Sequence, residues 1–235
     1  MTAKLMNRMT AGAALILVAA LGATAGALAA GALAMLLSTA APDLALSSNL
    51  PWYITRAAGV TAYLLLSADA ILGLGISTRL LDRFVSRATS FILHEWLAWL
   101  ALGATGLHIV ALLVDTVQPF SFADILIPFA ATYRPLATGL GVIAMYLAAL
   151  LTLSFYVRGR IGQRAWRALH YATFALFVLA TIHGITAGAT QDLGWMRWIY
   201  AGSAGVVGFM TAWRIANGRR VARRATTAAS TTVSR

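Results

Sequence analysis

Four histidines are the residues of this sequence whose type and spacing point most directly to chemistry. They are His94, His108, His170 and His183, so the first two are 14 residues apart and the last two 13 residues apart. Neutral imidazole is a common ligand of metal ions. The chain contains no cysteine, which excludes disulfides, iron–sulfur clusters, thiolate-bound zinc and haem attached through a C-x-x-C-H motif. Any cofactor must therefore be held by other ligands.

The segments that carry these histidines are strongly apolar. Hydrophobic residues make up 60% of the 235 residues and charged residues only 11%, whereas a soluble domain has about 25% charged residues. So few charged groups cannot cover a water-facing surface, so we predict an integral membrane protein. The apolar runs are continuous rather than alternating, which favours helices over a porin-type barrel.

Six apolar segments are long enough to cross a bilayer, which takes about 20 residues. They are 11–37, 53–76, 91–114, 136–156, 168–188 and 195–215. The first follows Lys4 and Arg8 and could be a signal peptide, but its length favours a retained helix, because the apolar part of a signal peptide has only about 7–15 residues. We therefore predict an all-α membrane protein, a six-helix transmembrane bundle.

The basic residues between these segments predict the orientation of the chain. Fifteen of the 18 Lys and Arg residues fall at the two termini and in the loops that join the second to the third and the fourth to the fifth segment. The opposite side has only Arg56, Arg134 and Arg197. Because cytoplasmic loops carry the excess of Lys and Arg, both termini should be cytoplasmic.

The orientation places the histidines at two depths. The third and fifth segments both begin on the Arg-rich side, and a rise of 1.5 Å per residue separates their histidines by about 21 Å and about 19.5 Å. His94 and His170 should then lie near the cytoplasm, and His108 and His183 near the outside. Two such levels between parallel helices fit two stacked haems, each with two axial imidazoles and no open position, as in an electron carrier.

Helix geometry does not fit this pairing perfectly. Thirteen residues rotate by about 1300°, about 140° short of four turns, so His183 leaves the face of His170 on an ideal helix. A tilt of the helix, a π-bulge or a different position of the haem would have to compensate for this missing rotation. The alternative interpretation is that the four histidines are unrelated polar residues satisfied by neighbouring helices. A zinc site would need clustered ligands rather than ligands about 20 Å apart.

With these histidines, the chain resembles the ferric reductase-like transmembrane domain family. Two motifs add to the resemblance: Trp166-Arg-Ala-Leu-His170 before the fifth segment, and Trp52-Tyr-Ile-Thr-Arg56-Ala-Ala-Gly59 at the start of the second. The resemblance implies six helices and two non-covalent b-type haems, each held by one histidine of the third helix and one of the fifth. Larger members continue into a flavin and nicotinamide domain that is not found in this sequence, so the resemblance implies a separate electron donor.

The extent of the resemblance, together with the composition of the two ends, divides the chain into three parts. Residues 1–50 are expected to form an N-terminal transmembrane helix and an outer loop. Residues 51–215 correspond to the di-haem transmembrane domain. Residues 216–235, rich in Arg, Ala, Thr and Ser, are expected to form a disordered basic cytoplasmic tail that is attracted to anionic lipid.

Five further polar residues have predicted roles near the haems. Arg56 and Arg134 lie on the outer side, where Arg is scarce, and are candidates for binding the anionic propionates of the outer haem. Arg167 is the corresponding candidate for the inner haem. Each of these arginines could instead be an interface anchor or an ordinary cytoplasmic charge. Asp69 or Glu95 could hydrogen-bond an axial histidine or take up a proton coupled to reduction.

The function expected from these features is electron transfer across a membrane, in a bacterial cytoplasmic membrane. The donor would be a cytoplasmic flavin or flavoprotein, and the acceptor an extracytoplasmic ferric ion, oxygen or redox protein. The basic charge is explained by topology, so no nucleic-acid partner is expected. One alternative is a cytochrome b subunit that exchanges electrons with membrane quinone, and another is a non-redox scaffold or transporter. Whether the chain is itself an enzyme stays open at this stage.

Overall fold

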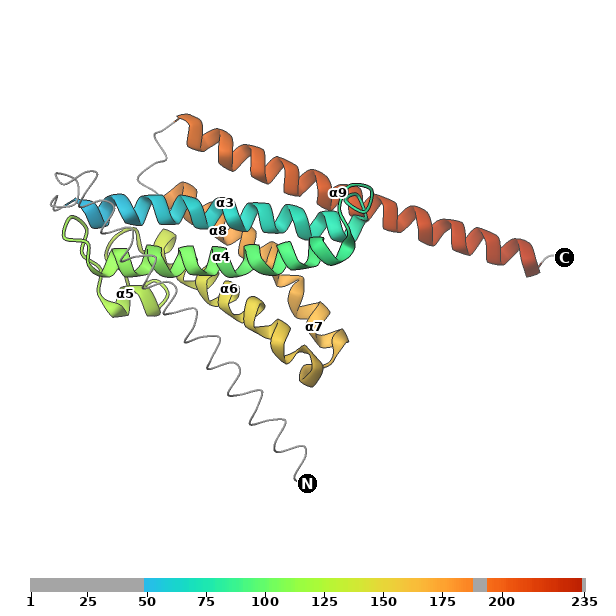
Figure 1. Cartoon of the computed structure of the whole chain (residues 1–235), viewed down its shortest axis with the longest axis horizontal. Coiled ribbons are helices and arrows are strands. Elements are labelled where there is room, and N and C mark those ends of the chain that lie inside the picture. Colours follow the sequence, from blue (N-terminus) through green and yellow to red (C-terminus); the bar gives the residue numbers. More distant parts are fainter. Residues whose placement is uncertain (1–48, 188–193, 234–235) are drawn as a thin grey trace, which may run out of the picture. The chain divides into compact units, whose positions relative to one another are not determined.

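The computed structural model describes residues 49–187 and 194–233, which form helices and no strand (Figure 1). The chain divides into two compact units, Met1–Leu50 and Pro51–Arg235. The helices are α3 Leu50–Thr78, α4 Arg87–Leu113, α5 Phe122–Leu126, α6 Pro135–Ile161, α7 Gln163–His170, α8 Ala172–Ala187 and α9 Gly194–Val233. The predicted all-α class is confirmed for these residues, and the predicted segment 11–37 lies outside them.

Four of the described helical segments are long and apolar enough to cross a membrane. They are α3, α4, α6 and the continuous segment Gln163–Ala187, which contains α7 and α8. The protein itself buries only 11% of the most apolar part of α4 and 28% of that of α3. The apolar residues left exposed are suited to lipid contact, which supports an integral membrane protein. The predicted sixth segment, 195–215, lies within α9, which is not one of the four.

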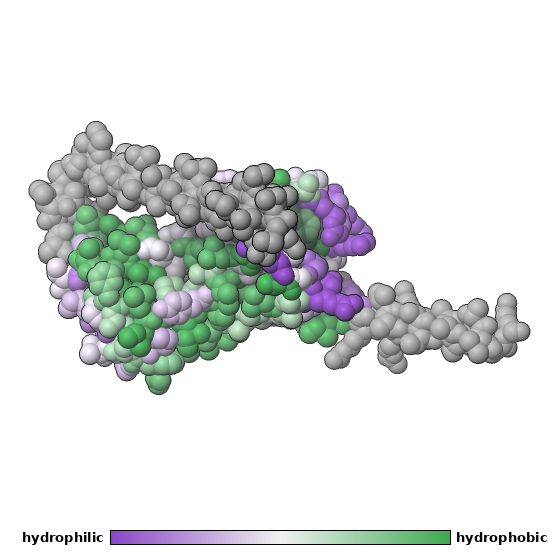
Figure 2. Space-filling model, turned by 90° about the horizontal axis from the view of Figure 1, so that it is seen from below, coloured by the Kyte–Doolittle hydropathy of each residue, from purple (hydrophilic) through white to green (hydrophobic). Residues whose placement is uncertain are grey.

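Hydrophobic and hydrophilic side chains separate clearly on the surface. Figure 2 shows apolar side chains spread over the flank of the described part, while hydrophilic side chains gather at one end. Exposed arginines follow α3 and occupy the junction of α6 and α7, and both places lie at the same end of the molecule (Figure 1). These arginines are Arg79, Arg83, Arg87, Arg158, Arg160, Arg164 and Arg167.

A buried cluster joins α3 to α8 and α9. Tyr63 of α3 packs with Phe177 of α8 and Met196 of α9, and Met196 is completely buried. The Tyr63 hydroxyl also lies 3.1 Å from the Thr181 hydroxyl and 2.7 Å from the Ser203 hydroxyl. A second cluster packs α6 against α8. These contacts fix the position of α8 relative to the helices on either side of it.

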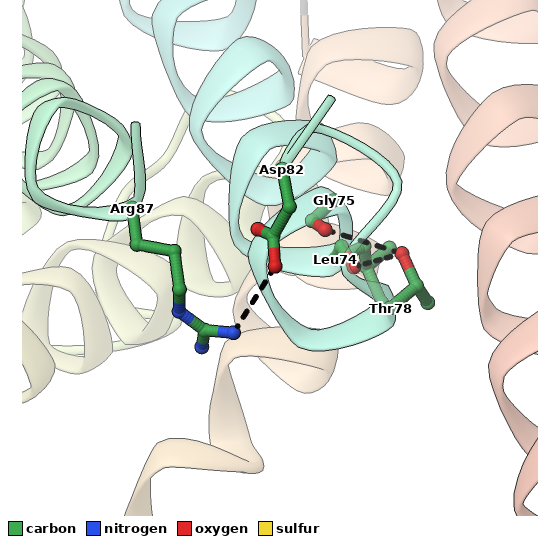
Figure 3. Close-up of polar contacts among 5 residues, drawn as sticks. All are labelled: Leu74, Gly75, Thr78, Asp82 and Arg87. Atoms are coloured by element: carbon green, nitrogen blue, oxygen red, sulfur yellow. Dashed lines mark hydrogen bonds and ion pairs between the residues drawn. The ribbon is translucent and has the colours of Figure 1, made fainter. Parts of the chain in front are cut away.

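The turn between α3 and α4 is closed by short-range polar contacts (Figure 3). The Thr78 hydroxyl donates to the carbonyl oxygens of Leu74 at 2.8 Å and Gly75 at 3.2 Å, which satisfies acceptors at the end of α3. Arg87, the first residue of α4, lies 3.4 Å from the Asp82 carboxylate. The turn therefore returns the chain so that α4 runs back alongside α3 (Figure 1).

The loop after α4 contains the short helix α5. Ser121 and Asp124 form a capping box, in which the Ser121 hydroxyl accepts from the Asp124 N–H and the Asp124 carboxylate accepts from the Ser121 N–H at 2.7 Å. Hydrogen bonds from the hydroxyl and the N–H of Ser121 hold the pKa of the Asp124 carboxyl below its usual value. The Tyr146 hydroxyl of α6 donates to the Leu126 carbonyl at 2.7 Å and joins the loop to the bundle.

The fifth predicted segment, 168–188, is interrupted between its two histidines. His170 ends α7, Tyr171 lies between the helices, and α8 begins at Ala172. The Tyr171 N–H bonds to the Ala168 carbonyl and the Phe174 N–H to the Tyr171 carbonyl, both at 3.2 Å. These three-residue steps are of the 3₁₀ type, which rotates about 120° per residue instead of about 100°. The tighter turn recovers part of the rotation that an ideal helix lacks between the two histidines.

The end of the chain differs from the predicted disordered tail. The structure continues α9 as a helix to Val233, whereas disorder was expected from residue 216. The segment is rich in Ala and Arg, which are among the residues with the highest intrinsic helix propensity, and it contains no proline.

Candidate functional site

The structure brings the four histidines together in two pairs. The ring centroids of His94 and His170 are 6.2 Å apart, and those of His108 and His183 are 6.5 Å apart. The two rings of each pair are nearly perpendicular, at 85° and 80°. The expected pairs are thus close neighbours, while their role as metal ligands stays a prediction.

The spacing within each pair fits one metal ion between two imidazoles. An imidazole nitrogen binds a metal at about 2.0–2.1 Å and lies about 1.1 Å from its ring centre, so two opposed imidazoles on one ion have centroids about 6.3 Å apart. Among the described residues, no group of three or more His, Cys, Asp or Glu could hold a metal ion. A two-histidine pair therefore suits an ion whose other ligands come from a cofactor, as the four pyrrole nitrogens do in haem.

Backbone carbonyls orient both histidines of the pair His108–His183, which is called the outer pair because it is predicted to lie near the outside, as His94–His170, the inner pair, is predicted to lie near the cytoplasm. Nδ1 of His108 is 2.8 Å from the Thr55 carbonyl oxygen of α3, and Nδ1 of His183 is 2.8 Å from the Ala137 carbonyl oxygen of α6. A carbonyl oxygen only accepts, so each Nδ1 carries the proton. This tautomer leaves Nε2 as the nitrogen with a lone pair for a metal.

Glycines allow three of the imidazoles to approach a neighbouring helix. A Cβ atom at Gly59 would lie 3.0 Å from Nδ1 of His108, and one at Gly73 would lie 3.1 Å from Cε1 of His94. A Cβ at Gly141 would lie 2.6 Å from the ring of His183. Gly73 and Gly141 were not among the residues predicted to matter for the site. Gly59 and Gly73 are 14 residues apart, like His94 and His108 on the antiparallel partner helix, and this matched interval was the signal available in the sequence.

The inner pair has different neighbours. Nδ1 of His94 lies 2.6 Å from Oδ1 of Asp69 on α3. The two atoms are in close contact without the alignment of a hydrogen bond, and neither has a hydrogen-bond partner among the described residues. His170 instead stacks on Trp166, with ring centroids 5.1 Å apart and an interplanar angle of 24°. Of the two carboxylates considered from sequence, the structure thus places Asp69 beside His94.

The carboxylate of Glu95, the neighbour of His94 in the sequence, bonds to a residue of α6 instead. This carboxylate accepts a hydrogen bond from the Tyr156 hydroxyl of α6 at 2.7 Å, and Tyr156 accepts one from Nε1 of Trp99 at 2.9 Å. Adjacent positions on a helix point about 100° apart, so a neighbour in the sequence need not share a partner. Glu95 therefore joins α4 to α6 through Tyr156.

Both histidine pairs line one cavity of about 1230 Å³ between the helices. A pocket for a single small molecule measures about 300–1,000 Å³, so this cavity has room for more than one such ligand. Its walls are mainly apolar side chains of α3, α4, α6 and α8, including Leu66, Leu102, Val142, Met145 and Leu176. A smaller cavity of about 200 Å³, lined by His108 and His183 among others, adjoins the outer pair.

Besides the two atoms of the Asp69–His94 contact, two buried polar atoms of residues that line the large cavity have no hydrogen-bond partner among the described residues. They are Oγ1 of Thr55, whose own carbonyl orients His108, and Nε1 of Trp166, which stacks on His170. Leaving such a donor unpaired costs about 1–3 kcal/mol. One unpaired donor beside each pair fits a ligand with acidic oxygens at both levels. The residues present therefore fit two haems.

The three arginines predicted to bind propionates occupy different positions. Arg56 lines both cavities, and its guanidinium lies 4.2 Å from the ring centre of Trp52. Arg167 lines the large cavity. Arg134 is not among the residues that line either cavity, and its guanidinium donates to the Thr186 carbonyl at 2.5 Å. The structure also places Arg214 of α9 on the cavity wall, which the sequence analysis did not foresee.

Comparison with known proteins agrees with the pattern of histidines. No curated protein and no solved structure matches the chain significantly. A family model described as the ferric reductase like transmembrane component matches residues 58–181, more than half of the chain. The match includes Asp69, His94, His108 and His170 and ends two residues before His183. The chain belongs to the ferric reductase-like transmembrane family.

Proposed function

We propose that this chain is a di-haem b-type cytochrome that transfers electrons across a membrane. The donor is a cytoplasmic flavin or flavoprotein, and the acceptor is an extracytoplasmic ferric ion, oxygen or redox protein. Membership of the family supports membrane electron transfer, and members of the family generally bind haem. The observation that carries the proposal is the presence of two histidine pairs, spaced at 6.2 Å and 6.5 Å, in one apolar cavity.

The histidines are proposed to bind the two irons through their Nε2 atoms. His94 and His170 hold the inner haem, and His108 and His183 hold the outer one. When bound, each haem would supply one-electron redox chemistry, and a pair of histidines on its iron would suit electron transfer rather than the binding of another ligand. The two histidines of α4, and likewise those of the segment Gln163–Ala187, are about 20 Å apart along the helix direction. The two levels together therefore extend over most of a bilayer core of about 30 Å.

The surrounding residues orient these ligands, exclude water and bind the propionates. The carbonyls of Thr55 and Ala137 fix the outer imidazoles. The apolar wall keeps water from the site, so the charge on a bound cofactor must be matched by protein groups. Arg56 is proposed to bind an outer propionate and Arg167 an inner one, because both line the cavity. For Arg134, whose guanidinium bonds to Thr186, we propose an indirect role at the same end.

The proposed topology has six transmembrane helices with both termini in the cytoplasm of a bacterial cell. The exposed arginines gathered at one end of the described part support this orientation, because cytoplasmic loops are rich in Lys and Arg. In this arrangement residues 1–50 supply one helix and an outer loop, residues 51–215 the haem-binding domain, and residues 216–235 a basic cytoplasmic segment. Tag accessibility in intact cells would test the orientation of both ends.

A vesicle experiment tests the transfer itself. The full chain, loaded with haem and oriented in proteoliposomes, is given reduced flavin inside and ferricyanide, which does not cross the membrane, outside. We expect ferricyanide reduction that is absent from vesicles with haem-free protein. A rate equal to that control would refute transmembrane electron transfer. Haem reduction by a quinol but not by flavin would instead favour the quinone-linked cytochrome.

A further inference from the structure

The carboxylate of Asp69 is the feature of the site that the proposed function leaves unexplained. It projects from the middle of α3, its side chain is 13% exposed, and its Oδ1 lies 2.6 Å from Nδ1 of His94. A carboxylate within a membrane-spanning helix is costly, and such residues commonly mark function. Its closest described polar neighbour is an imidazole that the proposed function assigns to the inner haem.

The outer pair provides the reference for this contact. There the Nδ1 atoms of His108 and His183 meet neutral carbonyl oxygens at 2.8 Å. A carboxylate beside the second nitrogen of a bound histidine would bring a negative charge close to the metal, which a neutral carbonyl does not. That charge would stabilise the oxidised over the reduced iron.

The arginines near the inner pair act in the opposite direction. Arg79, Arg87, Arg158, Arg167 and Arg214 all line the large cavity, and positive charge favours the reduced state. The first four are exposed, so solvent and salt screen much of their effect. Asp69 is more buried and in direct contact with the His94 ring, so its charge is screened less.

We propose that Asp69 is a positioning residue that sets the inner haem at a lower reduction potential than the outer haem. This inference rests on the proposed di-haem function. It also predicts the direction of electron transfer, because electrons lose free energy when they pass from the inner haem to an outer haem of higher reduction potential. The asymmetry comes from what supports each imidazole, since the ligands themselves are histidines at both levels.

The test compares two substitutions, each of which removes one negative charge from a residue near His94. Asp69→Asn keeps the size of the side chain and removes the charge that touches His94. Glu95→Gln removes a carboxylate one residue from His94 that bonds to Tyr156 instead. Redox titration of the haem absorption bands in the purified full chain should show one midpoint potential raised by Asp69→Asn. Glu95→Gln should give a smaller shift.

A second substitution assigns the potentials to the two levels. In His108→Ala, which removes an outer ligand, the remaining haem should titrate at the lower of the two wild-type potentials, and adding Asp69→Asn should raise it. Equal shifts at both haems in Asp69→Asn, an equal effect of Glu95→Gln, or a higher inner potential would each overturn the proposal. If Asp69→Asn does not retain haem, Asp69→Glu, which keeps the charge, must hold the inner potential below the outer one.

The result is separable from a failure of the proposed function. The di-haem cytochrome would be refuted if the purified protein bound no haem. It would also be refuted if every one of the four His→Ala variants retained the same single haem. If the protein binds two haems and Asp69→Asn changes neither reduction potential, the di-haem function stands and this inference is refuted.

Discussion

The inner and outer histidine pairs have nearly the same ring spacing but differ in the groups that support them. Both outer imidazoles are held by backbone carbonyls, from Thr55 and Ala137. The inner pair has the Asp69 carboxylate against His94 and the Trp166 ring against His170. A carbonyl of a helix backbone is present whatever the side chain, whereas Asp69 and Trp166 depend on residue type. The outer level is therefore defined by backbone position, and the inner level by two side chains that can be substituted.

Glycine is distributed unequally between the two levels as well. Both outer histidines approach a glycine, Gly59 for His108 and Gly141 for His183. At the inner level Gly73 approaches His94, while His170 is covered by Trp166. The outer rings are thus confined more tightly by neighbouring helices. We expect the outer site to tolerate less added volume and the inner site to respond more to a change of charge.

The largest expected effect is the loss of one haem when any ligand is removed. His108→Ala and His183→Ala should each lower the haem content by about half, because one axial ligand cannot replace two. They should remove the same spectral component, and His94→Ala and His170→Ala the other. The haem-to-protein ratio and low-temperature absorption spectra measure this. Four different spectral losses would show that the pairs are wrong.

The next effect should come from the glycines. Gly141→Ala places a Cβ 2.6 Å from the His183 ring, and Gly73→Ala places one 3.1 Å from the His94 ring. Because close-packed interiors resist added volume, the first substitution should lower the occupancy of the outer haem by about half or more, and the second should change the inner haem only slightly. Gly103→Ala, which meets no atom within 4 Å, is the matched control. If Gly73→Ala lowered haem occupancy more than Gly141→Ala did, the outer site would not be the more tightly packed of the two.

A smaller effect is expected from the arginines. Arg56→Ala removes a positive charge beside the outer pair and should lower the outer reduction potential more than the inner one, because the two levels are about 20 Å apart. Arg134→Ala should shift it less, since that guanidinium bonds to the Thr186 carbonyl. Redox titration of each variant gives both values. Equal shifts at the two haems would contradict the placement of Arg56.

The last prediction concerns the salt concentration and needs no substitution. The exposed arginines lie at the inner end, so an anionic flavin or acidic donor should be steered there. Raising the ionic strength from 0.01 M to 0.15 M shortens the screening length from about 30 Å to about 8 Å and should slow the first reduction about tenfold. Transfer between the haems should not change, because that step is buried. Stopped-flow traces at both salt concentrations separate the two steps, and equal slowing of both would argue against steering.

The sequence was sufficient to predict the helices and the histidine pairs because both depend on simple periodicities. The predicted segments 53–76 and 136–156 lie within α3 and α6, and the segment 91–114 extends one residue beyond the end of α4. The rise per residue along a helix predicted the depth of each histidine, and the excess of Arg on one side predicted the orientation of the chain. The rotational misfit of His183 could not be resolved in this way, because the break at Tyr171 is a local change of helix type that depends on tertiary packing.

The sequence by itself determined the family, the helical class and the histidines that we propose as haem ligands, since these follow from composition, residue type and spacing along the chain. The tertiary structure decided which groups on other helices meet those residues. It placed Asp69 rather than Glu95 beside His94, and Gly141 beside His183. These contacts depend on the rotation and separation of packed helices, which change by a few ångströms without altering any sequence pattern. The physical difference between the inner and outer sites is therefore set at that level.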